Sequence, residues 1–560
     1  MDFNRYFTNS ELENTLKGWA QTYPTLLNLT ILGESYEKRP IWLLTITNKA
    51  NGLDIEKPAI WLDGNIHATE IAGTTTTLYI AYNLLNGYGK DDRITRILNT
   101  CTCYIAPRVN PDGAELALAT NPRYIRSGVR PYPWEEKDDG LHQQDIDGDG
   151  RILQMRIVDP NGDWKISSLD NRLLEKRAPD EYGGTYYRLL PEGLIDDYDG
   201  YQIKLARPPE GLDFNRNFPY EWKPEAEQHG AGPYPASEPE SKALLDFVTS
   251  HPNINLAITY HTSSGVILRP YSTKSDDDMD TEDLWVFKKI GTLGSKHTGY
   301  RCVSTFHDFK YHPKEVTYGA FDDWIYDHLG VFSFTVELWD LPTMAGIKDR
   351  KFTEWYREHP HEEDLRVLKW VEKNIGIDAY VQWYTYTHPQ LGQVELGGWN
   401  MMYTWRNPPL TFIEKEAERN YPFVLSLADL LPHLHLASLQ VKSLGNDDFH
   451  LNLVIDNTGF LPTYTSQQGK KRQSARPVRA ELELSEGVQI INGKRRVEIN
   501  HLEGRSNKLE VSSTWGSGAT DHRTRVEWVL HGLEGSKVIL SVLSERAGTI
   551  HIETILKSTI

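Results

Sequence analysis

Cysteine is scarce in this sequence, and basic residues are outnumbered by acidic ones. The 560 residues include three cysteines, Cys101, Cys103 and Cys302. A small, odd number of cysteines argues against a disulfide scaffold and is typical of a reducing compartment. The formal net charge of −18 argues against a nucleic-acid partner, because such proteins present a basic face.

Long apolar runs are also missing. No stretch is long enough to span a bilayer, so we expect no membrane partner. Residues 1–19 lack the basic, apolar and small-residue order of a signal peptide. We therefore expect a cytoplasmic protein, unless a precursor segment has been removed.

A chain of 560 residues is too long for one ordinary core, so two or three domains are expected. Residues 1–380 alternate strand and helix patterns, which predicts an α/β domain with a mixed, largely parallel sheet flanked by helices. Within it, residues 131–207 are rich in Asp, Gly, Pro and Tyr and indicate an insertion. Residues 381–435 are expected to form a connector with a helix. Short alternating strands over 436–560 predict an all-β, immunoglobulin-like sandwich.

The spacing His-x-x-Glu occurs four times, where about one match is expected by chance. Context favours His67 and Glu70, which follow a short apolar strand and precede a helix. Ligands in α/β sheets bind at such carboxyl ends of strands. The other matches begin at His312, His359 and His531, in polar loops or in the predicted sandwich.

A zinc hydrolase needs three protein ligands and one open position for water. His261, just past a buried apolar strand, is the natural third candidate, although a hydrogen-bonded histidine at a strand end is the alternative. Glu337 ends another apolar strand. Burying a carboxylate is unfavourable without a partner, so this residue is either a general base or a salt-bridged structural group.

Several short motifs follow one another in a distinctive order: His-x-x-Glu, "NPDG", Arg, "NRN", His after a strand, Tyr and "FTVEL". This order resembles the zinc carboxypeptidases of the carboxypeptidase A type over residues 5–345. The resemblance implies one Zn²⁺ per chain and a peptide substrate with a free C-terminal carboxylate.

The resemblance also implies a role for each matching residue. His67, Glu70 and His261 match the zinc ligands. Glu337 matches the carboxylate that takes a proton from the zinc-bound water and delivers it to the leaving amine. Arg126 matches the arginine that stabilises the oxyanion, with Arg123 one register away as the alternative.

Further matches concern substrate binding. Asn215 and Arg216 match the pair that grips the terminal carboxylate, a role suited to the planar fork of arginine. Tyr318 matches the mobile tyrosine that covers the substrate, with Tyr326 as the alternative. Asp322 matches the residue that lines the pocket for the last side chain, where an acid would favour C-terminal Lys or Arg.

The chain departs from the family between Arg126 and Asn215, where the insertion falls. We expect the insertion to lie on the rim of the cleft and to narrow access. The family's usual arginine after "EL" is Trp339 here.

The insertion contains "DIDGDGRILQMR", which has the spacing of a calcium loop. Asp145, Asp147 and Asp149 occupy the first three ligand positions, but Arg156 stands where the final Glu is required. Ca²⁺ and a plain Asp/Gly turn both remain open.

The sequence thus predicts a zinc-dependent metallocarboxypeptidase with Glu337 as general base and a preference for basic C-terminal residues. One alternative is a relative that hydrolyses cell-wall peptides or other amides. The other is a binding protein with an inactive peptidase domain, against which Glu337 and the three ligands argue. The sandwich is expected to serve packing or solubility.

Overall fold

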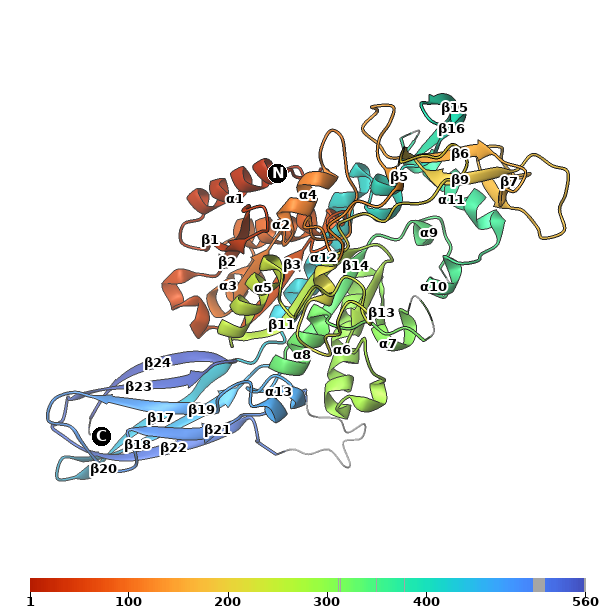
Figure 1. Cartoon of the computed structure of the whole chain (residues 1–560). Coiled ribbons are helices and arrows are strands. Elements are labelled where there is room, and N and C mark those ends of the chain that lie inside the picture. Colours follow the sequence, from red (N-terminus) through yellow and green to blue (C-terminus); the bar gives the residue numbers. More distant parts are fainter. Residues whose placement is uncertain (311, 313, 349, 377, 507–518, 558–560) are drawn as a thin grey trace.

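The computed structural model describes residues 1–310, 312, 314–348, 350–376, 378–506 and 519–557. Figure 1 shows three parts in a row, with an α/β domain between a small outer sheet and a β-sandwich. We call them the central domain, the outer sheet and the sandwich.

The central domain is built on an eight-stranded sheet. Its strands, in spatial order, are β1 (Leu27–Glu34), β2 (Pro40–Ile46), β4 (Thr102–Ala106), β3 (Ala59–Gly64), β11 (Ile254–Thr262), β14 (Phe332–Leu338), β12 (Val266–Arg269) and β13 (Arg301–Ser304). Pairing is parallel from β4 through β3 and β11 to β14, and antiparallel at β1–β2, β2–β4 and β12–β14. This mixed sheet, parallel in its centre and fully buried there, confirms the predicted fold.

Helices flank this sheet (Figure 1). They are α1 (Asn9–Thr22), α2 (Ala72–Gly87), α3 (Asp92–Thr100), α4 (Pro111–Ala117), α5 (Pro239–Ser250), α6 (Thr281–Thr298), α7 (Thr305–Asp308), α8 (Phe321–Leu329) and α12 (Leu410–Ala428). In α1, a capping box of Thr8 and Glu11 starts the helix, and Leu12, Leu16 and Trp19 form the buried face. Among the described residues, no helix combines the length and apolar character needed to cross a membrane.

Helix α12 lies in the stretch that we expected to be a connector. It packs against α2 and α6, and its Ile413, Phe423 and Leu427 are buried in the main core. Residues 410–428 therefore complete the central domain rather than link it to the next unit.

The outer sheet joins the insertion to residues beyond 380. Its order is β15 (Tyr380–His388), β16 (Gly392–Trp399), β6 (Gln154–Val158), β9 (Tyr187–Pro191), β7 (Trp164–Ile166) and β8 (Leu174–Lys176). Two further insertion strands, β5 (Gly140–Gln143) and β10 (Gly193–Asp196), pair with each other. Helices α9 (Leu341–Met344), α10 (Phe352–Trp355) and α11 (His361–Asn374) connect β14 to this sheet.

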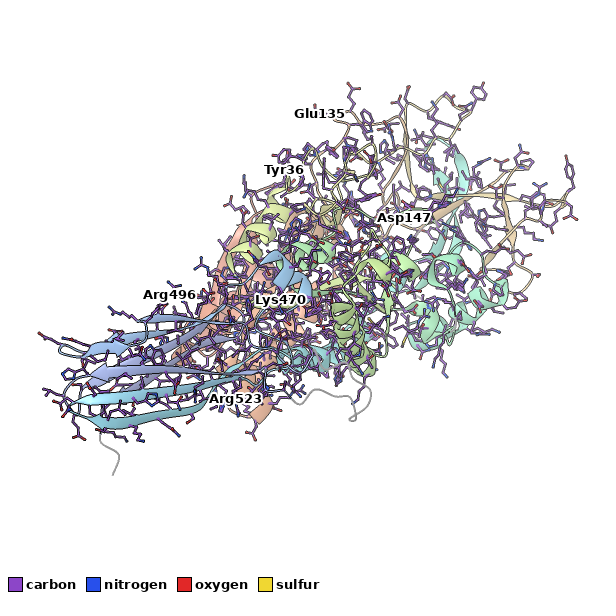
Figure 2. The ribbon with its side chains drawn as sticks, turned by 90° about the horizontal axis from the view of Figure 1, so that it is seen from below. Tyr36, Glu135, Asp147, Lys470, Arg496 and Arg523 are labelled. Atoms are coloured by element: carbon purple, nitrogen blue, oxygen red, sulfur yellow. The ribbon has the colours of Figure 1, made fainter. Side chains whose placement is uncertain are left out.

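The sandwich consists of two four-stranded sheets around one apolar core. One contains β17 (Leu434–Gly445), β18 (Asp448–Asn457), β22 (Arg523–His531) and β20 (Gln489–Asn492). The other contains β21 (Arg496–Asn500), β19 (Val478–Leu484), β23 (Lys537–Ser544) and β24 (Gly548–Ile555). Helix α13 (Gln467–Arg472) of this part packs against α8 of the central domain. Figure 2 shows Arg496 and Arg523 among the side chains of the sandwich.

Candidate metal and active site

Three neighbouring parallel strands end at the site. His67 and Glu70 lie in the loop between β3 and α2, and His261 lies near the carboxyl end of β11. Glu337 pairs with His261 in the register of β14 against β11. The predicted residues therefore meet because the sheet order brings these strand ends together.

The loop after β3 requires glycine and asparagine. A Cβ atom on Gly64 would lie 2.7 Å from the backbone of Gly73, so only glycine allows α2 to start this close to the strand. Asn65 adopts a left-handed φ of 59°. Its amide nitrogen donates to the carbonyl oxygens of His67 and Ala68, at 2.7 and 3.2 Å. These contacts fix the loop that carries both candidate ligands.

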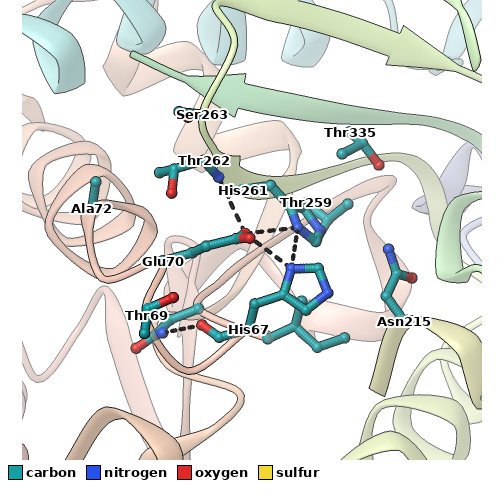
Figure 3. A network of polar contacts seen from close by, with 12 residues as sticks. His67, Thr69, Glu70, Ala72, Asn215, Thr259, His261, Thr262, Ser263 and Thr335 are labelled. Carbon is teal, nitrogen blue, oxygen red and sulfur yellow. Dashed lines mark hydrogen bonds and ion pairs between the residues drawn. The ribbon is translucent and has the colours of Figure 1, made fainter. Parts of the chain in front are cut away.

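Three candidate ligand atoms converge where this loop meets the end of β11 (Figure 3). His67 Nδ1, His261 Nδ1 and Glu70 Oε2 lie 3.0 Å from one another. Zinc bonds of 2.0–2.1 Å in a tetrahedron place ligand atoms about 3.3 Å apart. All three side chains are buried. Two imidazole nitrogens and one carboxylate oxygen thus form a donor set that fits Zn²⁺ and leaves a fourth position open.

The second ring nitrogen of each histidine, Nε2, also has a polar partner. His67 Nε2 lies 3.1 Å from Asp213 Oδ1, and His261 Nε2 lies 3.3 Å from Thr259 Oγ1. The Thr259 hydroxyl in turn donates to Asp63 at 2.7 Å. These contacts place the N–H on Nε2 of each ring, so that the Nδ1 lone pair faces the cluster.

Asp213, which the motif order did not single out, organises this region. Its second oxygen accepts from Arg126 Nε at 2.8 Å. Burial would raise its pKa, but Arg126, Arg216 and His67 together hold that pKa well below its usual range. The sequence feature that could have indicated Asp213 is an acid two positions before Asn215, in "LDFNRN". Without the fold, nothing in the sequence connects it to His67.

Arg126 is the predicted arginine that reaches the site. Its Nη1 donates to Glu70 Oε1 at 3.2 Å. Arg123, the alternative, is instead paired with Glu210, and its side chain is 52% exposed. The geometry therefore favours Arg126.

The Glu337 side chain is partly exposed and lies beside Glu70 and Arg126 at the site. Burial, reinforced by the charge of Glu70, raises its pKa to about 8, against the opposing effect of His261, Arg126 and Arg406. A carboxylate with a pKa near neutrality suits proton transfer.

Asn215 and Arg216 lie in the short helix η3 (Phe214–Arg216). The side-chain oxygen of Asn215 accepts from Phe321 N at 2.8 Å, which leaves its amide N–H₂ group as the donor. Tyr318 is partly exposed, and its backbone N–H is held by Gln228. Tyr326, the alternative, is buried in the core and donates to Asp283 at 2.9 Å. Only Tyr318 has the exposure that contact with a substrate requires.

Asp322 is buried in the first turn of α8. Its carboxylate accepts from Asp323 N at 3.1 Å and from the Thr335 hydroxyl at 3.2 Å. Burial raises its pKa. Asp322 does not line the cavity described next.

A cavity of about 400 Å³ opens onto Glu70, Arg126 and Glu337. Its walls otherwise come from Thr262, Ser263, Ser264, Phe309, Thr353, Tyr356, Arg357, Met401, Trp405 and Arg406. Among the described residues, none of the insertion 131–207 lines it. The expectation that the insertion forms the rim is therefore wrong for this cavity, because β6 draws that segment into the outer sheet. Residues from 353–357 and 401–406 line it instead, and no local motif marks them.

The remaining sequence matches lie apart from the site. His359 contacts Asp364, and His531 contacts Asp448. Carboxylate oxygens of Asp145, Asp147 and Asp149 do lie within 4.8 Å of one another. They already accept hydrogen bonds from the loop, for example from Gly148 N and Gly150 N to Asp145.

Comparison with known proteins agrees with this geometry. A family model described as zinc carboxypeptidase matches residues 12–357, more than half of the chain. Residues 433–554 match a domain of unknown function. Carboxypeptidase A2 of Rattus norvegicus is 27% identical over 60% of this chain and 64% of its own length. Carboxypeptidase O of Bos taurus is 26% identical over 68% of this chain and 81% of its own length.

The chain thus spans less than two thirds of the rat relative. The crystal structure of thrombin activatable fibrinolysis inhibitor aligns with 76% of this chain and 74% of its own length, at 20% sequence identity. The TM-score is 0.42, which is too low to support a family. The matched residues include every strand of the central sheet, the three candidate ligands and Glu337. The chain belongs to the zinc carboxypeptidase family.

Proposed function

We propose that this protein is a zinc-dependent carboxypeptidase that releases the C-terminal residue of peptides. The observation that carries the proposal is the convergence of His67, Glu70 and His261 beside Glu337 at three adjacent strand ends. A family match alone would not show that the chemical groups are assembled.

Zinc at the three ligands would supply a water of lowered pKa and a Lewis acid. Glu337 would accept the proton from the attacking water and pass it to the leaving amine. Arg126, fixed by Asp213, would place a guanidinium next to the developing oxyanion. The full set of groups supports an enzyme over a binding protein.

Asn215 and Arg216 would bind the terminal carboxylate. The Arg216 side chain is 13% exposed, and its Nη1 donates to Asn215 O at 2.7 Å, so the position of its guanidinium is restricted before substrate arrives. Such a guanidinium fork donates one hydrogen bond to each oxygen of a carboxylate. This supports a free C-terminus over an internal amide.

Preference for basic C-terminal residues remains a prediction. Asp322 is buried, and both of its oxygens accept hydrogen bonds within the protein. A carboxyl with a raised pKa attracts a cation less strongly than an ionised one.

Calcium binding likewise remains a prediction. Burial and the charges of Asp147 and Asp145 raise the pKa of nearby Glu192 to about 7. The aspartates are satisfied by backbone N–H groups, which an Asp/Gly turn explains equally well. Calorimetric titration of calcium into metal-free protein decides between them, and no heat of binding would exclude calcium.

A panel of blocked dipeptides ending in Arg, Lys, Phe, Leu or Glu tests the proposed activity. We expect release of the terminal amino acid, its loss with a zinc chelator and its return with zinc. Glu337→Gln should lower kcat/KM about 10²- to 10⁴-fold while zinc stays bound. Glu486→Gln, at an exposed sandwich position, is the matched control. Activity that survives Glu337→Gln would overturn the assigned mechanism.

A further inference from the structure

One wall of the cavity comes from outside the matched stretch 12–357. Helix η5 (Met401–Arg406) follows β16 directly and contributes Met401, Trp405 and Arg406 to the lining. These side chains share the cavity with Glu70 and Glu337. The reaction site of this chain therefore includes a segment far from the family's core.

Two side chains hold η5 in place. Asn407, fully buried, donates to Thr69 O at 2.7 Å and accepts from Ala72 N at 3.1 Å. Both partners flank Glu70 in sequence. On the other side, Trp339 Nε1 donates to Thr404 O at 2.7 Å. The tryptophan after "EL" thus links η5 to the strand that carries Glu337.

The insertion supports η5 from a distance. Strand β6 pairs with β16, and Arg156 on β6 makes a two-point contact with Glu395 on β16, at 2.9 and 3.2 Å. Because β16 leads directly into η5, the outer sheet sets the position at which η5 starts.

Arg406 points its charge into the site. Its side chain is 46% exposed, and Nη1 lies 3.9 Å from Glu70 Oε1. The cavity is lined by three guanidinium groups, from Arg126, Arg357 and Arg406, against the carboxyls of Glu70 and Glu337. If Glu70 binds a divalent cation, the net charge of the cavity lining becomes strongly positive. The guanidinium of Arg406 can then attract an incoming anion.

The cavity lies on one side of the histidines. Thr262 and Ser263 line it, and Figure 3 shows Asn215 on the opposite side of His67 and His261. A substrate whose terminal carboxylate is bound at Asn215 would place its scissile carbonyl at the cluster. The part before that carbonyl would then enter the cavity.

We propose that Arg406 is a specificity residue that binds a carboxylate on the acyl side of the scissile bond, so that the enzyme favours peptides with Asp or Glu in the penultimate position. This proposal rests on the proposed carboxypeptidase function. The supporting observations are the direction of the cavity, its positive lining and the fixed position of η5.

The test compares kcat/KM of zinc-loaded protein for blocked Glu-Leu, Ala-Leu and Lys-Leu. We expect the wild type to favour Glu-Leu over Ala-Leu about tenfold, the effect of one charge-assisted hydrogen bond, and over Lys-Leu by more. Arg406→Gln should bring the Glu/Ala ratio close to one, chiefly through KM. Arg406→Lys should restore part of it. Arg496→Gln, a matched loss of charge on the sandwich, should leave the ratio at the wild-type value.

Trp339→Phe keeps an aromatic side chain, smaller than the indole, but removes the donor to Thr404, so it should reduce the Glu/Ala ratio in part. Equal kcat/KM for the three substrates in the wild type would overturn the proposal. So would an equal loss on all three in Arg406→Gln, which would place Arg406 at the oxyanion instead. Absence of hydrolysis of any dipeptide would contradict the carboxypeptidase function itself.

Discussion

At the scale of single residues, Asp213 is the group on which the ligand geometry depends most. It fixes the ring of His67 through one oxygen and the guanidinium of Arg126 through the other. One carboxylate therefore orients both a candidate zinc ligand and the candidate oxyanion group.

Asp213→Asn should weaken zinc binding about 10- to 100-fold, because the amide can no longer accept at both positions with full charge. A competition titration with a chromogenic zinc chelator measures this. Asp180→Asn, at an exposed insertion position, should bind zinc as the wild type does. Unchanged zinc affinity in Asp213→Asn would show that the His67 ring needs no such partner.

The three ligands and Glu337 could be predicted from the sequence because they lie at or just past the ends of apolar strands and occur within a distinctive order of motifs. Asp213, Trp339 and Arg406 act through contacts between segments far apart in the chain. Their roles depend on tertiary packing, which no local pattern encodes.

At the scale of elements, the outer sheet shows how the insertion is integrated. Arg156 is buried between the rings of Trp383 and Tyr187, at 4.4 and 4.9 Å, and is paired with Glu395. Composition predicts the insertion, but the pairing of β6 with β16 joins it to a strand in the stretch expected to be a connector.

Arg156→Met should lower the free energy of unfolding by about 2 kcal/mol, because two charge-assisted hydrogen bonds to the partly exposed Glu395 are lost. Thermal unfolding measures the shift. Arg188→Met, whose side chain is 44% exposed on neighbouring β9, is the control and should change stability little. Equal shifts for both variants would mean that the pairing with Glu395 contributes nothing specific.

In the sandwich, Arg523 on β22 makes a two-point contact with Asp456 on β18, at 2.6 and 2.8 Å. These hydrogen bonds lower the pKa of Asp456 from its ordinary value of 3.8. A lowered pKa means that the contribution to stability is present above pH 3.8 and is lost as the pH falls below it.

Asp456→Asn should therefore reduce stability by about 1 kcal/mol at pH 7, and the difference from the wild type should shrink at pH 3. Urea unfolding at the two pH values provides the measurement. A difference of equal size at both would show that ionisation of Asp456 is not involved.

At the scale of the whole molecule, the sandwich is docked firmly on the central domain. Arg546, fully buried, donates to Ile254 O and Leu329 O, the latter at 2.7 Å. A Cβ on Gly330 would lie 2.2 Å from the Cα of Gly469, so the two backbones are in close contact. Sequence pattern predicted the sandwich but not this contact, since buried polar groups at an interface leave no periodic signal.

Arg546→Met should destabilise the protein by about 3 kcal/mol, because it leaves buried carbonyl oxygens without donors. Calorimetry should show the first unfolding transition at lower temperature. Arg476→Met, at a side chain that is 73% exposed, is the control. An unchanged transition in Arg546→Met would mean that the two parts unfold independently.

We propose above that His67, Glu70 and His261 hold the catalytic zinc. The most direct measurement is a titration of metal-free protein with zinc while release of the C-terminal residue from a blocked dipeptide is followed. We expect activity to rise in proportion to zinc and to stop rising at one equivalent per chain. Hydrolysis by the metal-free protein, or no hydrolysis once one equivalent is bound, would contradict it.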